Sequence, residues 1–301
     1  MSNTEPTPTV GVIGLGIMGG EIARNLVDDG YDVVVNDVDR DAVETMVEYG
    51  ADARSSPVEI AAAADVVISS LPKGEHVRQI ALGDDGLVEG ADDELVYVDM
   101  STIGPSAIRE VGDGLEATGA KTIDAPVSGS EVGAREGTLR IMAGCDGEIP
   151  AVCRELFDVL GSRTVHAGGL GAGQVVKVCN NMIAATSLVT LSEALVFAEK
   201  AGVSQEKLVE GLEGSTGDTW VLQNRADAML EHDFEPGFFA SYQYKDLRIG
   251  IEDAQEYGVP VPVGSTSHEL FKSLEEKGRG KLDASAILTV LEDMAGLESE
   301  P

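Results

Sequence analysis

Three glycines between an apolar strand and a helical stretch constrain this chain more than any other feature. Gly14, Gly16 and Gly19 follow the β-type run Thr9–Ile13, and Met18–Asp29 has helical periodicity. In this context the first glycine permits a tight turn, the second lets a pyrophosphate approach the backbone, and the third lets the helix pack on the strand. The helix N-terminus offers unpaired N–H groups to the phosphates. We therefore predict a dinucleotide site, with a ligand-free turn as the alternative, at Gly14, Leu15, Gly16, Ile17, Met18 and Gly19.

An acidic residue closes the next strand, Asp32–Asn36. Asn36 and Asp37 follow Gly19 at the distance where a ribose-binding acid is expected. A carboxylate there accepts hydrogen bonds from the adenosine ribose and repels a 2′-phosphate, so we predict NAD as the cofactor. The nearby Arg40 keeps NADP possible. The alternative interpretation of Asp37 is a solvated acid in a very acidic chain.

Strand and helix patterns alternate through the first half of the chain. Besides the two strands above, Val66–Ser70 and Leu95–Asp99 read as buried parallel strands. Short strands are also expected at Thr122–Asp124, Leu139–Ala143 and Thr164–His166. Such alternation predicts an α/β fold, a Rossmann-type doubly wound parallel sheet with right-handed crossovers, over residues 1–168.

The pattern changes after the glycine-rich segment Gly168–Gly173. Gln174–Lys200 contains no proline or glycine and predicts one helix about 40 Å long. Further helices are expected at Gln205–Leu212, Asn224–Leu230, Lys245–Glu256, Ser265–Lys277 and Ala284–Leu291. We therefore predict an all-α domain over residues 169–301, built on a long inter-domain helix. Trp220 and the pair Phe238-Phe239 are expected to pack inside it.

The composition is strongly acidic, with 53 acidic against 21 basic residues and a net charge of −32. A surface of this sign repels nucleic acid and anionic membranes, so neither is an expected partner. The acids are spread along the chain, and lysine is scarce. Because salt at 1 M screens charges over about 3 Å, this surface favours a protein from a salt-accumulating organism.

Several functional classes are not expected. No apolar run approaches the roughly 20 residues needed to span a bilayer, and the N-terminus lacks the pattern of a secretory signal. The three cysteines show no CxxC spacing, which indicates reduced thiols in a cytoplasm. No metal-ligand spacing appears. The four histidines are His76, His166, His232 and His268. None of them lies in a recognisable cluster with an acid partner.

Two later segments carry polar groups suited to a small anionic substrate. Asp124–Ser130 is followed by further glycines, and such loops bind carboxylates through backbone N–H groups and serine hydroxyls. A plain serine–glycine turn is the alternative. Lys177 and Asn181 are spaced to share one helix face. Since Lys177 lies in an apolar segment, it either extends to solvent or is held in a cleft.

Four ordered segments together resemble the β-hydroxyacid dehydrogenase family. They are VIGLGIMGGEIARNL, DAPVSGSEVGAREGTL, GAGQVVKVCNN and KDLRIGIEDAQEYGVPVP, and the similarity covers nearly the whole chain. The resemblance implies a two-domain homodimer or homotetramer acting on a small carboxylic acid. It implies that Lys177 is the catalytic acid/base and that Asn181 binds substrate. It assigns the substrate carboxylate to Ser128, Gly129 and Ser130, and the lining of the cofactor site to Leu71, Pro72, Ser101, Thr102 and Lys245.

The substrate stays open within this family. Many members have glycine where this chain has Ser130. The segments KVCNN and STGDTW lean toward 3-hydroxyisobutyrate dehydrogenases, whereas GAREGTL is closer to tartronate semialdehyde and succinic semialdehyde or glyoxylate reductases. A non-catalytic dinucleotide-binding module and an imine reductase are further alternatives, but relatives of both kinds usually lack the lysine.

Overall fold

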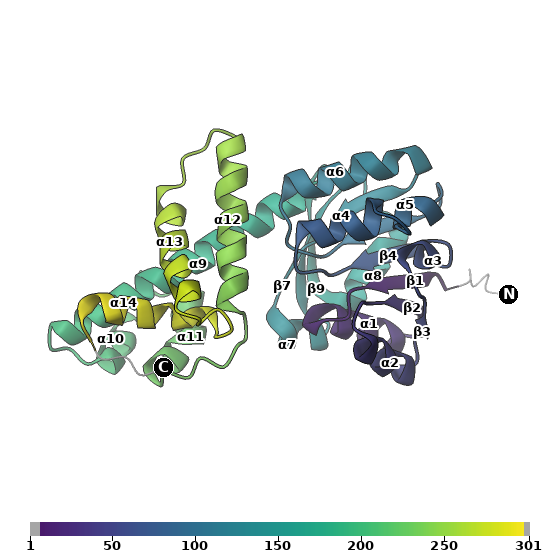
Figure 1. Cartoon of the computed structure of the whole chain (residues 1–301). Coiled ribbons are helices and arrows are strands. Elements are labelled where there is room, and N and C mark those ends of the chain that lie inside the picture. The colour runs from purple at the N-terminus through teal and green to yellow at the C-terminus, as the bar shows by residue number, and fades with distance from the viewer. Residues whose placement is uncertain (1–6, 298–301) are drawn as a thin grey trace. The chain divides into compact units, whose positions relative to one another are not determined.

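The computed structural model describes residues 7–297, and the chain divides into two compact units between Lys177 and Val178. We call them the α/β unit and the helical unit (Figure 1). The division lies nine residues beyond the boundary that the sequence predicts after residue 168. The residues on which the absence of a secretory signal was predicted lie largely outside the described range.

One sheet organises the α/β unit, in the order β3-β2-β1-β4-β5-β6-β8-β7, with β9 paired to β8. The first six strands are parallel, β7 and β6 run antiparallel to β8, and β9 runs parallel to it. The predicted doubly wound sheet is therefore confirmed. Its strands are β1 (Thr9–Ile13), β2 (Asp32–Asn36), β3 (Asp52–Ala53), β4 (Val66–Ser69), β5 (Val96–Asp99), β6 (Lys121–Asp124), β7 (Val127–Ser128), β8 (Leu139–Gly144) and β9 (Gly161–Gly168).

Helices cover both faces of this sheet, which is why its central strands β1, β2, β4 and β5 are largely apolar (Figure 1). In β1, Val12 packs into the core beneath α1, α2 and α8, whereas the next residue, Ile13, packs into the core beneath α3 to α6. The helices are α1 (Ile17–Asp28), α2 (Arg40–Tyr49), α3 (Pro57–Ala61), α4 (Gly74–Leu82), α5 (Leu87–Gly90), α6 (Pro105–Leu115), the 3-10 turn η1 (Glu116–Thr118), α7 (Ser130–Arg135) and α8 (Ala151–Leu160).

The helical unit forms no β-strand within its described residues, 178–297. Leu188 and Leu195 of α9 pack with Phe271 and Ile287 in a single core. Its helices are the major part of α9 (Ala172–Lys200), α10 (Gln205–Leu212), α11 (Trp220–Leu230), α12 (Ala240–Glu256), α13 (Pro262–Glu276), the 3-10 turn η2 (Ala284–Ala286) and α14 (Ile287–Ala295). Helix α11 begins earlier than the sequence predicts because Thr219 caps it, its hydroxyl accepting from Leu222 N–H.

Helix α9 corrects one expectation. We expected no apolar run of membrane-spanning length, yet α9 has 29 residues and a window of mean hydropathy 1.5. Half of that window is buried inside the protein, and its apolar residues supply much of the core of the helical unit. Packing in the core of the helical unit therefore accounts for the high hydropathy of α9.

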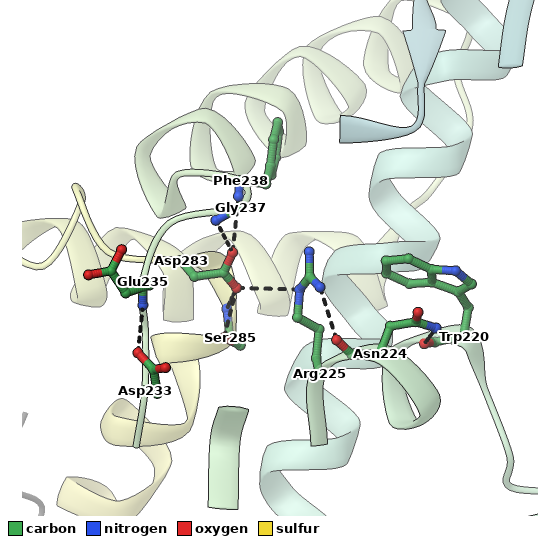
Figure 2. A network of polar contacts seen from close by, with 9 residues as sticks. All are labelled: Trp220, Asn224, Arg225, Asp233, Glu235, Gly237, Phe238, Asp283 and Ser285. Atoms are coloured by element: carbon green, nitrogen blue, oxygen red, sulfur yellow. Dashed lines mark hydrogen bonds and ion pairs between the residues drawn. The ribbon is translucent and has the colours of Figure 1, made fainter. Parts of the chain in front are cut away.

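The packing prediction for Trp220 is wrong. Its side chain is 63% exposed, and the Arg225 guanidinium lies 5.4 Å from the ring centroid (Figure 2). Phe238 and Phe239 are half-buried, and each makes an edge-to-face contact with Tyr242. An aromatic residue at the first position of a helix need not face the core, which its residue type alone does not reveal.

Candidate functional site

The glycine loop connects β1 to α1 and has the geometry that a dinucleotide requires. Gly14 has φ +91°, and a Cβ there would meet Ser70 O at 2.4 Å. A Cβ on Gly19 would lie 1.8 Å from Gly14 O, so these two glycines are required by the chain itself. Around Gly16, by contrast, no heavy atom lies within 4 Å of such a Cβ. Gly16 is also the N-cap of α1, whose first turn has no acid and no side-chain cap, so the loop fits a pyrophosphate.

We expect Gly16→Ala to weaken NAD binding without unfolding the protein. The added methyl group meets no protein atom, but it projects into the space that a pyrophosphate needs. We expect about a tenfold or greater rise in the Kd for NAD, and a loss of no more than about 1 kcal/mol in stability. Calorimetric titration and thermal unfolding measure the two effects. Gly211→Ala, at another open glycine, is the matched control, and an unchanged Kd in Gly16→Ala contradicts the prediction.

Asp37 is bonded to the glycine loop. Its Oδ2 accepts from Leu15 N–H at 2.5 Å, and its Oδ1 accepts from Asp39 N–H at 2.8 Å. Asn36 holds the glycine loop and the neighbouring chain in place, because its carbonyl accepts a hydrogen bond from Gly14 N–H and its side chain donates one to Arg54 O. The half-buried carboxylate therefore lies beside the loop, at the end of β2, where a ribose hydroxyl would reach it.

A buried network organises the ends of β4 and β5. Asp99, fully buried, accepts from Ser69 Oγ at 2.7 Å and from Ser101 Oγ at 2.6 Å. Ser101 Oγ in turn accepts from Leu71 N–H at 2.8 Å. Tyr97 donates to Ser69 Oγ, and burial, aided by the charge of Asp99, raises the tyrosine pKa well above its usual value. The network joins the Leu71-Pro72 and Ser101-Thr102 segments, both of which the family resemblance assigns to the cofactor site.

Two residues that the sequence analysis did not single out tie the start of α9 to the sheet. The Asp124 carboxylate accepts from Gly171 N–H at 2.6 Å and from Gln174 N–H at 2.7 Å. The buried Gln174 side chain accepts from Ile103 N–H and donates to Ser101 O. This anchoring explains why the α/β unit extends into α9. Lys177 follows one turn later and is only 8% exposed, which favours the cleft interpretation of this lysine.

Asp124 makes stability depend on pH. Burial raises its pKa from 3.8 to about 6, although the two backbone hydrogen bonds oppose the shift. Because the folded state holds this proton more tightly, the contribution to stability is present below about pH 4 and is lost as pH rises through about 6. We expect the stability of the wild type relative to Asp124→Asn to fall by up to about 3 kcal/mol over that range. Urea unfolding of both proteins at a series of pH values tests this, and a constant difference contradicts it.

The predicted carboxylate-binding residues follow one another at the end of β7. Ser128 is half-buried, while Gly129 and Ser130 are exposed. Gly129 has φ +144° and Ser130 has φ +57°, with Ser130 Oγ donating to Gly129 O. A φ in this left-handed region favours glycine. This accounts for the glycine that many β-hydroxyacid dehydrogenases, the family that this chain resembles, have at the position of Ser130.

In the helical unit, Asn181 and Lys245 share a partner that the sequence analysis missed. Asn181 Nδ2 donates to Asp246 Oδ2 at 2.5 Å, and Lys245 Nζ lies 2.9 Å from Asp246 Oδ1. Gln243 Nε2 donates to Asn181 O, and Asn180 Nδ2 donates to Asn181 Oδ1. All but Asn180 and Lys245 are buried. The bond to Asp246 fixes which way the Asn181 amide faces, and the only sequence signal for this acid is its position next to Lys245.

The prediction that no histidine has an acid partner is wrong for two of them. His232 Nε2 lies 3.0 Å from Glu292 Oε1, sixty residues away in sequence, and His268 Nδ1 lies 3.2 Å from Glu269 Oε1. Burial raises the pKa of Glu292, and His232 opposes that shift. His166 makes hydrogen bonds to the carbonyls of Cys145 and Gly168. No cluster of His, Cys, Asp and Glu able to hold a metal ion is present among residues 7–297.

Comparison with known proteins assigns the chain along nearly its full length. Residues 9–169 match a family model described as the NAD binding domain of 6-phosphogluconate dehydrogenase. Residues 171–291 match one described as NAD-binding of NADP-dependent 3-hydroxyisobutyrate dehydrogenase. A probable mitochondrial 3-hydroxyisobutyrate dehydrogenase of Dictyostelium discoideum is 33% identical over 96% of this chain and 92% of its own. The 2-hydroxy-3-oxopropionate reductase of Escherichia coli is 34% identical, over 95% of this chain and 98% of its own.

A solved structure supports the same assignment. The 3-hydroxyisobutyrate dehydrogenase of Mycobacterium tuberculosis, solved with L-serine, superposes with a TM-score of 0.87 at 32% identity, covering 95% of this chain and 99% of that one. The matched relatives are dehydrogenases and reductases that act on CH–OH groups with nicotinamide cofactors. On this evidence, the chain belongs to the β-hydroxyacid dehydrogenase family of NAD(P)-dependent oxidoreductases.

Proposed function

We propose that this protein transfers a hydride between NAD and a small hydroxy acid resembling 3-hydroxyisobutyrate, with Lys177 as the general acid/base. The observation that carries the proposal is the buried Lys177, one turn beyond Gln174. Gln174 is hydrogen-bonded to the Ser101 segment, which is predicted to line the cofactor site. The lysine is thus tied to the cofactor-binding end of the sheet. Support for NAD over NADP comes from Asp37 beside the glycine loop.

Each residue has a defined part in the proposed reaction. The bound nicotinamide supplies the hydride acceptor or donor. Ser128, Gly129 and Ser130 hold the substrate carboxylate, and Lys177 accepts the hydroxyl proton during oxidation and returns it during reduction. Asn181 orients the substrate, because one N–H of its amide is committed to Asp246 and the other can face the substrate oxygen.

Other substrates of the same class are the second candidates. The Escherichia coli relative is named for 2-hydroxy-3-oxopropionate, and the Mycobacterium tuberculosis structure contains L-serine. Succinic semialdehyde and glyoxylate are further possibilities, and a non-catalytic dinucleotide-binding module is the alternative without turnover. We also propose a homodimer or homotetramer, as the family resemblance implies, and a cytoplasmic location, which the three free cysteines support. The charge of −32 supports a salt-accumulating organism as the source.

A substrate panel tests the proposal. NAD and NADP are each combined with 3-hydroxyisobutyrate, glycerate, 4-hydroxybutyrate and serine, in dilute and in molar KCl, and formation of the reduced nicotinamide is followed by absorbance. We expect NAD with 3-hydroxyisobutyrate to give the highest kcat/KM, and activity to rise with salt as charge repulsion is screened. A folded protein that binds NAD but reduces it with no member of the panel favours the non-catalytic module.

A further inference from the structure

Two arginines continue the sheet outward from Ser128. Strands β7 and β8 are antiparallel with Ser128 opposite Arg140, and β8 and β9 are parallel with Arg140 opposite Arg163. Residues directly opposite one another in a ladder place their side chains on the same face. Ser128, Arg140 and Arg163 therefore form a row across three strands, with neighbouring strands about 4.8 Å apart.

The row faces away from the core beneath α1 and α8. Val127, Leu139 and Ile141, which alternate with Ser128 and Arg140 along their strands, are buried in that core. Because successive side chains of a strand point to opposite faces, Ser128 and Arg140 point to the other face. Both arginines are exposed there. A ligand at the Ser128 hydroxyl would lie one strand away from Arg140 and two strands away from Arg163.

Neither guanidinium has a hydrogen bond or an ion pair to any residue between 7 and 297. Most arginines of the described chain do have such a partner, although Arg40 also lacks one, and the nearby Arg135 forms an ion pair with Glu131. Two like charges directly opposite each other in a ladder destabilise the sheet. An anion between them would remove that repulsion, and an arginine can bind a carboxylate through two parallel hydrogen bonds.

We propose that Arg140, assisted by Arg163, forms a subsite for a second carboxylate of the substrate. The inference rests on the proposed function, in which Ser128 holds the first carboxylate. Ser128 and Arg140 lie on neighbouring strands about 4.8 Å apart, and the long arginine side chain can extend along a ligand held at Ser128, so two carboxylates joined through two or three carbons can occupy the two positions. The substrate class is then a hydroxy acid with two carboxylates, and a monocarboxylate fills only the part of the site at Ser128.

A matched pair of substrates tests the subsite. 3-Hydroxyisobutyrate and 2-(hydroxymethyl)butanedioate share the same hydroxymethyl-bearing carbon and carboxylate, and differ in whether its other substituent is a methyl group or a carboxymethyl group, which carries the second carboxylate. We expect Arg140→Gln to lower the ratio of kcat/KM for the dicarboxylate to that for the monocarboxylate by about tenfold or more. Arg140→Lys should retain part of the ratio, and Arg163→Gln should lower it less.

Arg154→Gln, at another exposed arginine of the α/β unit, is the control and should leave the ratio unchanged. Equal losses on both substrates, or an unchanged ratio in Arg140→Gln, overturn the subsite while leaving the proposed function intact. If the wild type oxidises neither compound, the proposed function fails on its own. Calorimetric binding of the dicarboxylate to the NAD complex then decides the subsite, since equal affinity in wild type and Arg140→Gln rejects it.

Discussion

Replacing Lys177 with alanine is expected to lower kcat/KM by about 10²–10⁴-fold, because a positioned acid/base group contributes about that factor. The cause is the loss of the group that accepts the hydroxyl proton as the hydride leaves. NAD affinity should change little, since the glycine loop and Asp37 lie on other elements. Steady-state kinetics on the best substrate of the panel, together with NAD titration of the same preparation, separate the two effects.

Lys200→Ala is the matched control, because Lys200 lies on the same helix, is exposed and has no ion pair within the described chain. It should keep wild-type kinetics and stability. Unchanged turnover in Lys177→Ala would remove the lysine from the mechanism. Loss of NAD binding together with turnover would instead make Lys177 a residue that holds the cofactor.

Replacing Asp283 with alanine is expected to destabilise the helical unit by about 3–5 kcal/mol. Asp283 is 3% exposed and accepts hydrogen bonds from Gly237 N–H, Phe238 N–H and both the N–H and the hydroxyl of Ser285 (Figure 2). Arg225 Nε lies 3.6 Å from the same carboxylate. Alanine leaves all these donors without their acceptor, and water cannot readily reach Ser285, which is fully buried.

Urea unfolding of the whole chain measures this loss, and the only tryptophan, Trp220, reports it because its ring lies against Arg225. Asp233→Ala is the control, since that exposed acid accepts a single hydrogen bond of 3.3 Å from Glu235 N–H. The loss of unfolding free energy in Asp283→Asn should lie between those of the two alanine variants, because asparagine keeps the shape of the side chain but not its charge. A loss below about 1 kcal/mol in Asp283→Ala would show that water satisfies the network.

Much of the α/β unit is predictable from sequence because its strands are buried on both faces and read as continuous apolar runs. β1 and β2 have the predicted bounds, and β4, β5, β6 and β8 differ by a residue at an end. β3 and β7 have two residues each, which is too short for any pattern. Helix starts were less predictable, as α12 begins five residues before the predicted Lys245.

The candidate site could be predicted only where its residues lie within one motif. The glycine loop and the Lys177–Asn181 pair are local, so the sequence can single them out as candidates. Asp246 is 65 residues from Asn181 in sequence, and Asp283 is 46 from Gly237, so their bonds depend on tertiary packing that no local pattern encodes. Asp124 lay within a recognised motif, yet its bond to the start of α9 also spans 50 residues.

Strand β9 has a consequence for how this protein avoids aggregation. It has eight residues, pairs only with β8 in the sheet, and exposes Arg163 and Val165. An open strand edge is a template for pairing with another chain. In dilute buffer a net charge of −32 keeps copies apart, but molar salt shortens that repulsion to about 3 Å. In molar salt, protection of this edge would then come from shape, namely the irregular register of β9 at both ends, and from the exposed side chain of Arg163 on the strand.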